Sequence, residues 1–277
     1  YEILRCLVGS EMCIRDRNYM QARSGFDSNF TSYDYMAIVG QSLGLIYGYE
    51  FDGIYQYSDF YSVPGSSTLV LKEGVTSNPS LGNRLAPGAV KYKDQDGDGV
   101  ITTKDRTVIG NALPKWYGGI TNTFNYKGID FSFMLQFNYG NDIYNATRLY
   151  ATQTNTQRRN QLAEVADRWS PTNASNKVPS YNGYVVNDVY SRFVENGSFL
   201  RLKNITLGYT LPHKWTRSFH ASKLRIYATG QNLFCLNNYS GYDPEVSTAS
   251  KSPMTPGLDW GAYPKSRVFT FGIDLQF

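Results

Sequence analysis

One segment of the chain has the residue spacing of a calcium-binding loop. Within residues 94–105, carboxylates stand at positions 1, 3, 5 and 12, and Gly99 stands at position 6, where the loop must turn sharply. Ca²⁺ takes about six to eight oxygen ligands, and this spacing wraps oxygen atoms around one point. The sequence therefore predicts a structural Ca²⁺ site whose ligands are Asp94, Asp96, Asp98, the backbone carbonyl of Val100, and Asp105.

This loop departs from the EF-hand in two respects. Position 12 is Asp105 rather than glutamate, so bidentate closure is less assured. Residues 90–93 lack the pattern of an amphipathic helix, so no full EF-hand is expected. The alternative is an acidic, glycine-rich turn that stays hydrated without metal. Either way, one carboxylate-rich loop without a paired base is no catalytic site.

The rest of the chain offers little catalytic chemistry. His213 and His220 have no cysteine or carboxylate at ligand spacing, and no nucleophile-elbow, phosphate-loop or dinucleotide motif occurs. The net charge of +4 is modest and no Lys/Arg cluster is present, which argues against a nucleic-acid partner. We expect no enzyme and no organic cofactor. A secreted glycosidase would need two carboxylates facing one cleft, and the sequence selects no such pair.

The elements around the loop are predicted from a strict period of two. In residues 267–277, one strand face is apolar and the other is small or polar. The apolar set is Phe269, Phe271, Ile273, Leu275 and Phe277, and the alternating set is Val268, Thr270, Gly272, Asp274 and Gln276. An amphipathic strand of roughly ten residues that ends on an aromatic residue is typical of an outer-membrane β-barrel. We expect the apolar set to face lipid and the polar set to face inward.

The same alternation recurs upstream. It is clear in residues 129–139, 224–231 and 45–52, and looser in 116–126 and 199–209. Lys127 and Gly128 separate two of these segments and predict a tight hairpin turn. Strands of a soluble β-sandwich alternate too, so a calcium-dependent carbohydrate-binding sandwich remains the alternative. In that fold the apolar faces would be buried against a second sheet.

Composition favours the barrel. The chain holds 23 Tyr, 15 Phe and 4 Trp, and its mean hydropathy is −0.41. No run approaches the roughly 18 apolar residues of a transmembrane helix. Interfacial aromatic girdles require tyrosines at strand ends. The tyrosines expected there are Tyr47, Tyr49, Tyr117, Tyr126, Tyr139, Tyr144, Tyr209 and Tyr227.

The first seventeen residues do not resemble the rest. Residues 6–17 match the in-frame translation of a widely used transposase sequencing adapter, so we expect residues 1–17 to be an artefact outside the fold. They hold two of the three cysteines, which leaves Cys235 without a disulfide partner. Residues 18–277 are expected to form about seven or eight strands with long polar loops, as outer-membrane barrels do on their outer side. Those loops are 54–90, 94–115, 150–198 and 237–266.

Several segments together resemble one protein family. They are residues 39–56, 92–110 and 193–209, Gly-Gln-Asn-Leu-Phe at 230–234, Gly-Tyr-Asp-Pro-Glu at 241–245, and the terminal strand. In this order they resemble the C-terminal part of a SusC/RagA-type TonB-dependent outer-membrane transporter. The resemblance covers essentially all of residues 30–277.

The resemblance implies an all-β fold: an antiparallel transmembrane segment, the C-terminal third of a roughly 22-stranded outer-membrane barrel with long extracellular loops. Such proteins import oligosaccharides or peptides into bacteria, driven by TonB, and work with a SusD-like surface lipoprotein. The N-terminal plug and the TonB-contacting segment have no counterpart here. The fragment alone is therefore not expected to transport.

Overall fold

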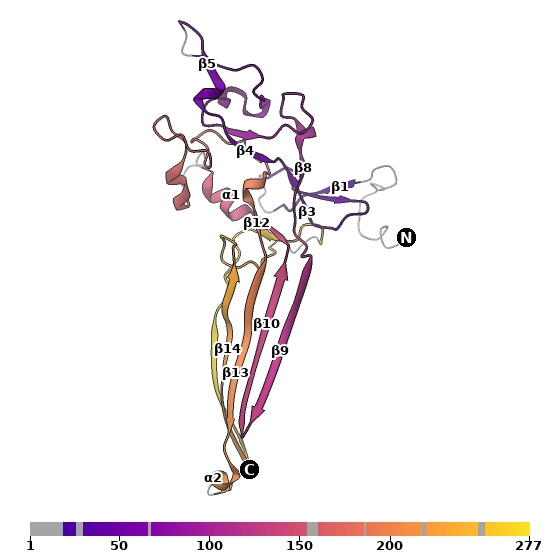
Figure 1. Cartoon of the computed structure of the whole chain (residues 1–277), viewed down its shortest axis with the longest axis vertical. Coiled ribbons are helices and arrows are strands. Elements are labelled where there is room, and N and C mark those ends of the chain that lie inside the picture. The colour runs from indigo at the N-terminus through magenta and orange to yellow at the C-terminus, as the bar shows by residue number, and fades with distance from the viewer. Residues whose placement is uncertain are drawn as a thin grey trace. The chain divides into compact units, whose positions relative to one another are not determined.

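The computed structural model describes residues 19–25, 30–65, 68–153, 160–185, 187–217, 220–248 and 253–277 (Figure 1). The chain forms two compact units. The first comprises Tyr1–Leu113, Tyr144–Val194 and Ser247–Trp260, and the second Pro114–Ile143, Glu195–Val246 and Gly261–Phe277. Residues 1–17 lie outside the described residues, so the expectation that they add no strand stays a prediction. No helix among the described residues has the length and apolar character needed to cross a membrane.

The second unit is built on five long antiparallel strands. Their order in the sheet is β16-β14-β13-β10-β9. The bounds are β9 Trp116–Tyr126, β10 Ile129–Tyr139, β13 Phe199–Thr210, β14 Lys223–Asn237 and β16 Val268–Gln276. Lys127 (φ 46°) and Gly128 (φ 86°) join β9 to β10, which confirms the tight turn. Both residues have positive φ, as a type I′ hairpin turn requires.

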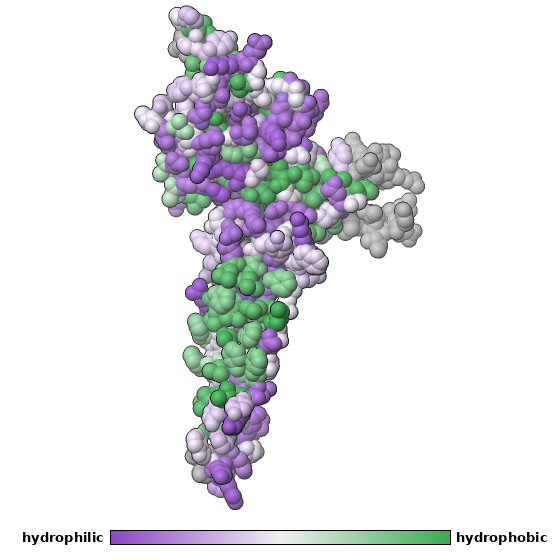
Figure 2. All heavy atoms as spheres, viewed as in Figure 1, coloured by the Kyte–Doolittle hydropathy of each residue, from purple (hydrophilic) through white to green (hydrophobic). Residues whose placement is uncertain are grey.

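The strand register gathers the apolar side chains on one face of this sheet. One row of directly opposed residues runs Phe124, Phe131, Leu207, Ala228, Phe271 across all five strands. The neighbouring row, on the other face, runs from Asp130 through Gly208 and Tyr227 to Gly272. The apolar face is uncovered: Phe271 and Ile273 are 81% and 71% exposed. Figure 2 shows hydrophobic side chains gathered over the long strands.

A bulge keeps this separation of faces along the full strand length. Leu202 pairs with Phe234 and Asn204 with Gln231, so the single residue Lys203 on β13 faces two residues, Asn232 and Leu233, on β14. Asn232 has φ 52° there, a conformation that asparagine tolerates better than most residues. A bulge resets the register of one strand against its neighbour. The apolar residues on both sides of it therefore share one face.

The first unit consists of short strands and single helical turns. Its sheets are β1-β2-β3-β8, β4-β7 and β5-β6, and β11 pairs in parallel with β15. The strand bounds are β1 Tyr19–Ala22, β2 Tyr35–Ile38, β3 Leu45–Gly48, β4 Phe51–Ile54, β5 Phe60–Ser62, β6 Leu69–Leu71, β7 Val90–Tyr92, β8 Thr107–Asn111, β11 Asp142–Asn145 and β15 Leu258–Asp259. Strand β12 (Val194–Asn196) adds to β11. The helices are α1 Ala146–Thr152 and, in the second unit, α2 His213–Thr216; the 3₁₀ turns are Tyr57–Asp59, Pro79–Arg84, Thr103–Asp105, Ala163–Asp167 and Ser191–Phe193.

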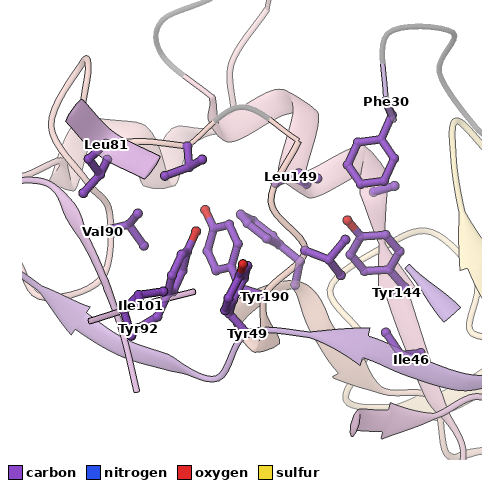
Figure 3. Packing of buried hydrophobic residues seen from close by; sticks show 14 of the residues in the cluster. Phe30, Ile46, Tyr49, Leu81, Val90, Tyr92, Ile101, Tyr144, Leu149 and Tyr190 are labelled. Atoms are coloured by element: carbon purple, nitrogen blue, oxygen red, sulfur yellow. The ribbon is translucent and has the colours of Figure 1, made fainter. Parts of the chain in front are cut away.

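Segments expected to be long polar loops pack a tyrosine-rich core in this unit (Figure 3). The rings of Tyr49 and Tyr92 stack with centroids 4.8 Å apart, and Tyr190 lies 5.5 Å from Tyr92 and 4.9 Å from Phe193. The expected girdle positions of Tyr49 and Tyr144 are therefore wrong, because both rings are buried in this core. Aromatic residues spaced without a period gave no signal of a core.

The predicted strand over residues 45–52 is also corrected. It divides into β3 and β4, which pair in different sheets. Between them Tyr49 pairs instead with the distant Tyr190, through an isolated parallel bridge. Residues 45–52 thus do form strands, but these strands pair with other short strands of the first unit and not with the long strands of the second. Five strands, rather than seven or eight, reach the length of a membrane-crossing strand among the described residues.

Candidate functional site

The predicted calcium loop lies between β7 and β8, and β7 confirms that no helix precedes it. Asp94, Asp96 and Asp98 each place a carboxylate oxygen within 4.8 Å of the other two. Backbone amides shape the loop around them. Gly97 and Gly99 donate to the two oxygens of Asp94, both at 2.7 Å. Three of the four predicted carboxylates therefore meet at one point.

Asp105 is not one of these three, although its carboxyl group interacts with that of Asp94. Its buried carboxylate accepts hydrogen bonds from the amides of Gln95 (2.8 Å) and Thr102 (2.7 Å). Burial by itself opposes ionisation, but these amide bonds outweigh it and hold the pKa of Asp105 below its ordinary value. Asp105 thus closes the two ends of the loop on each other as an ionised group. Its role as a metal ligand stays a prediction.

The base of the loop is fixed by backbone pairing. The amide of Ser77 donates to the carbonyl of Gly99 (2.9 Å), and the amide of Ile101 donates to the carbonyl of Ser77 (2.7 Å). Val100, which lies between Gly99 and Ile101 in the chain, donates its amide hydrogen to Asp98 Oδ1 (2.8 Å). The side chain of Ile101 is buried in the core of the unit. The acidic end of the loop is exposed, while its base belongs to the packed unit.

The polar face of the five-stranded sheet carries an ion pair for which the sequence holds no local signal. Arg225 on β14 donates to both oxygens of Asp130 on β10, with Nε–Oδ1 2.8 Å and Nη2–Oδ2 2.5 Å. Strand β13 lies between these strands, and the pair crosses it at Gly208. A Cβ atom on Gly208 would lie 2.5 Å from the Asp130 oxygens and 2.6 Å from Arg225 Nη2. The missing side chain is what lets the pair span three strands.

The same face otherwise carries uncharged polar groups. The hydroxyls of Thr206 and Thr229 lie 3.1 Å apart across β13 and β14. A Cβ on Gly272 would lie 2.2 Å from the Tyr227 ring, so that ring covers the glycine. The guanidinium of Arg225 stands 4.8 Å from the centroid of this ring. Tyr227, expected in a girdle, is thus part of the polar face.

The chain is similar to known receptors. TonB-dependent receptor P3 of Formosa agariphila is 34% identical over 242 residues, which are 86% of this chain and 22% of that receptor. TonB-dependent receptor SusC of Bacteroides thetaiotaomicron is 31% identical over 187 residues, 67% of this chain and 17% of SusC. The chain spans about a fifth of the length of these relatives. No family model matches it.

Solved structures agree at the level of fold. The RagAB peptide transporter superposes with a TM-score of 0.64 over 94% of this chain and 24% of that chain, at 21% identity. Its closed-closed state gives a TM-score of 0.66. The relatives are receptors and transporters, and the chain is not an enzyme. The chain belongs to the SusC/RagA-type TonB-dependent receptors.

Proposed function

We propose that the five long strands are part of the transmembrane β-barrel of an outer-membrane nutrient importer. The observation that carries this proposal is the uncovered apolar face opposite a polar face bearing the Asp130–Arg225 pair. Lipid offers backbone groups no hydrogen-bond partner, so strands cross a membrane only within a closed sheet. Both edges of the sheet, β9 and β16, would continue into further strands of a roughly 22-stranded barrel.

The lengths of the connections at the two ends of the long strands indicate which end faces the outside of the cell. The connection 127–128 is a tight turn, and residues 211–222 join β13 to β14 at the same end. The opposite end carries the long connections 140–198 and 238–267. Outer-membrane barrels have short periplasmic turns and long extracellular loops. Trp116 opposes Tyr139 at the end with long connections, and Tyr126 and Tyr209 flank Ile129 at the other, as two girdles would.

The soluble calcium-dependent sandwich is the weaker alternative. It would bury the apolar face against a second sheet, whereas Phe271 and Ile273 are largely exposed. Only in lipid does such a face reach a favourable environment without another protein layer.

The transported substrate is proposed to be an oligosaccharide or a peptide. The support is that the relatives include SusC, and that the RagAB structure of like fold is described as a peptide transporter. The proposed partners are a SusD-like surface lipoprotein at the extracellular side, outer-membrane lipid, and TonB, reached through parts of the protein outside this chain. This chain alone would not transport.

Uptake by the full-length protein tests the proposal. Cells carrying the full-length gene are given fluorescent oligosaccharide and peptide mixtures, with and without TonB, and a strain deleted for the gene is the control. We expect TonB-dependent uptake of one mixture, abolished by the deletion. Equal uptake in all strains, or recovery of the full-length protein in the soluble fraction, would contradict the proposal.

We also propose that residues 94–105 bind a structural Ca²⁺ ion. The support is the convergence of Asp94, Asp96 and Asp98 on a loop whose backbone amides already donate to all three carboxylates. Carboxylates this close repel one another without a cation. Replacing Asp96 and Asp98 together by Asn should abolish calcium heat in calorimetry and speed proteolysis of the loop, while barrel assembly stays intact. No heat from the wild-type protein at millimolar Ca²⁺ would leave only a hydrated acidic turn.

A further inference from the structure

An open groove follows β14 on the apolar face of the five-stranded sheet. Its volume is about 730 Å³, and Ala228 of β14 lies at its floor. Leu207 on β13 and Phe271 on β16 directly oppose Ala228 on its two sides, and both are largely exposed. A small side chain between two large ones leaves a channel. Its floor and walls stand on strands that pair with one another, so further strands at the sheet edges would leave the channel in place.

The groove extends toward the end of the strands that carries the short connections. The next row of opposed residues in that direction is Ile129, Tyr209, Ile226 and Ile273, and all four line the groove. Tyr126 opposes Ile129 at the start of the β9–β10 turn. One end of the groove therefore lies beside the aromatic residues of the proposed periplasmic interface.

A basic side chain of the β9–β10 turn stands next to this end of the groove. The ammonium Nζ of Lys127 lies 5.1 Å from the centroid of the Tyr126 ring. Tyr126 is two residues from Phe124, so the two rings share the apolar face of β9. Contact with that ring places the ammonium at the interfacial edge of the apolar face.

The connection between β13 and β14 adds cations at the same end, where Figure 1 shows α2. Residues 211–222 include Lys214 and Arg217, both exposed, and contain no Asp or Glu. Trp215, between these two cations, is also exposed. The ion pairs formed within the described part of the chain involve neither these two cations nor Lys127.

The carboxylates at this end belong to the opposite face of the sheet. Asp130 binds Arg225, and Asp274 opposes Arg225 in the strand register, so both acids lie on the polar face. The apolar residues of the five strands alternate with no Asp or Glu on their own face. An anion that approaches from the apolar side therefore meets cations and no carboxylate of that face.

These features match the two parts of an anionic phospholipid. The groove walls stand on strands two apart in the sheet, at roughly 10 Å, which admits one hydrocarbon chain between Leu207 and Phe271. Acyl chains gain free energy for each methylene group that they bury, and clustered Lys and Arg attract anionic headgroups. A second copy of the chain, related by a two-fold axis along the membrane normal, would bring the same cations together, and like charges repel.

We propose that this groove and the cations at its end bind an anionic phospholipid of the periplasmic leaflet. One acyl chain lies against Ala228, and the phosphate group is held by Lys127, Lys214 and Arg217. This inference rests on the proposed location of the long strands in the outer membrane. The bound lipid would tie the two short connections to the membrane interface.

Lipid titration of the full-length protein in detergent tests the headgroup site. Phosphatidylglycerol and phosphatidylcholine with identical acyl chains are added, and bound lipid is counted by native mass spectrometry. We expect phosphatidylglycerol to bind about tenfold more tightly. Replacing Lys127, Lys214 and Arg217 together by Gln should remove this preference and leave phosphatidylcholine binding unchanged. The control Lys115→Gln, at the opposite end of β9, should behave as wild type.

Ala228→Phe tests the groove itself. The added ring would occupy the space between Leu207 and Phe271 and should weaken binding of both lipids about tenfold, because fewer methylene groups are then buried. Ile120→Phe enlarges an exposed apolar side chain of β9 outside the groove and should leave lipid binding unchanged. Heat-modifiable electrophoresis establishes that each variant is assembled.

Three results would overturn the lipid site. They are equal wild-type affinity for the two lipids, an undiminished preference in the triple Gln variant, and unchanged lipid binding in Ala228→Phe. Dissociation of a dimer by Ala228→Phe, with lipid binding unchanged, would assign the groove to a second copy of the protein. TonB-dependent uptake in the same strains would leave the import function standing in each case. Recovery of the full-length protein in the soluble fraction would overturn both the import function and the lipid site.

Discussion

At the scale of single residues, Gly208 has the most demanding environment on the polar face. Replacing it by Ala would place a methyl group within 2.6 Å of the Asp130 and Arg225 atoms that pair above it. The pair would have to open or the strands to shift, at about 1–3 kcal/mol, the usual penalty of overpacking. Urea unfolding of the full-length protein in detergent measures this loss.

Gly119 is the matched control for that substitution. A Cβ there would meet the carbonyl of Leu135 at 3.2 Å, a contact that small adjustments relieve. Gly119→Ala should therefore lower stability less than Gly208→Ala. Equal losses for the two variants would mean that the crossing ion pair does not depend on the glycine.

Asp34 makes the first unit sensitive to pH. Its carboxylate is fully buried and accepts from the amide of Ser24 (2.7 Å) and from the Ser24 hydroxyl. Burial dominates these bonds and raises the pKa of Asp34 to about 6. The folded state therefore binds this proton more tightly than the unfolded chain does. The free energy of unfolding should fall by about 3 kcal/mol between pH 4 and pH 6 and stay level above, by linkage.

Hydrogen exchange of the Ser24 amide, corrected for its intrinsic rate, follows this change. Protection should weaken from pH 4 to pH 6 in the wild-type protein. In Asp34→Asn, which stays neutral, the fall in protection should be smaller than in the wild-type protein, and what remains should come from Asp188 of the same unit, whose pKa burial also raises to about 6. Asp52→Asn, a half-exposed carboxylate of this unit, should behave as wild type. A slope in Asp34→Asn as steep as that of the wild-type protein would show that Asp34 does not contribute.

At the scale of elements, the long strands were predictable because their side chains alternate without interruption. The pattern over residues 129–139 matches the bounds of β10. The predicted alternation in 224–231 is observed, but β14 runs on to Asn237, past a bulge in which two of its residues face one on β13. Periodicity is a local signal and is lost where a bulge shifts it, as on β13 between Ile205 and Leu202. It also cannot find the tyrosine core, whose members come from segments far apart in the chain.

The candidate sites also divide into those with a local pattern that the sequence predicts and those formed by residues far apart in the chain. The spacing of Asp94, Asp96 and Asp98 is local, and the structure brings these three together as predicted. The pairs Asp130–Arg225 and Arg201–Asp243 join residues 95 and 42 positions apart, and only strand order makes them neighbours. A single sequence contains no signal for such distant pairs beyond the presence of opposite charges.

The order of the loop after β14, residues 238–246, should depend strongly on Asp243, whose carboxylate binds the buried Arg201 guanidinium. Replacing it by Asn leaves the buried Arg201 charge without its carboxylate, at about 3 kcal/mol or more. Limited proteolysis of residues 237–246 should then accelerate. Glu245→Gln, which removes a half-exposed carboxylate of the same loop, should have a smaller effect. The reverse order would show that the exposed charges, not the buried pair, hold the loop.

At the scale of the whole molecule, the exposed apolar face should tolerate no charge. Phe271→Arg should destabilise the full-length barrel by about 2–4 kcal/mol if the residue lies near the bilayer midplane. Thr270→Arg, its neighbour on the polar face, should assemble normally. The fraction of heat-modifiable protein in outer membranes measures both. Equal assembly of the two variants would contradict the assignment of the apolar face, and not the polar face, to lipid.

The most direct test of the membrane assignment compares two adjacent residues of β16. Thr270 and Phe271 point to opposite faces of the same strand. Each is replaced by Cys in full-length protein whose native cysteines are changed to Ser, and intact outer membranes are treated with a water-soluble maleimide. We expect labelling at position 270 and protection at 271, with both labelled after denaturation. Labelling at 271 with protection at 270 would contradict the membrane assignment.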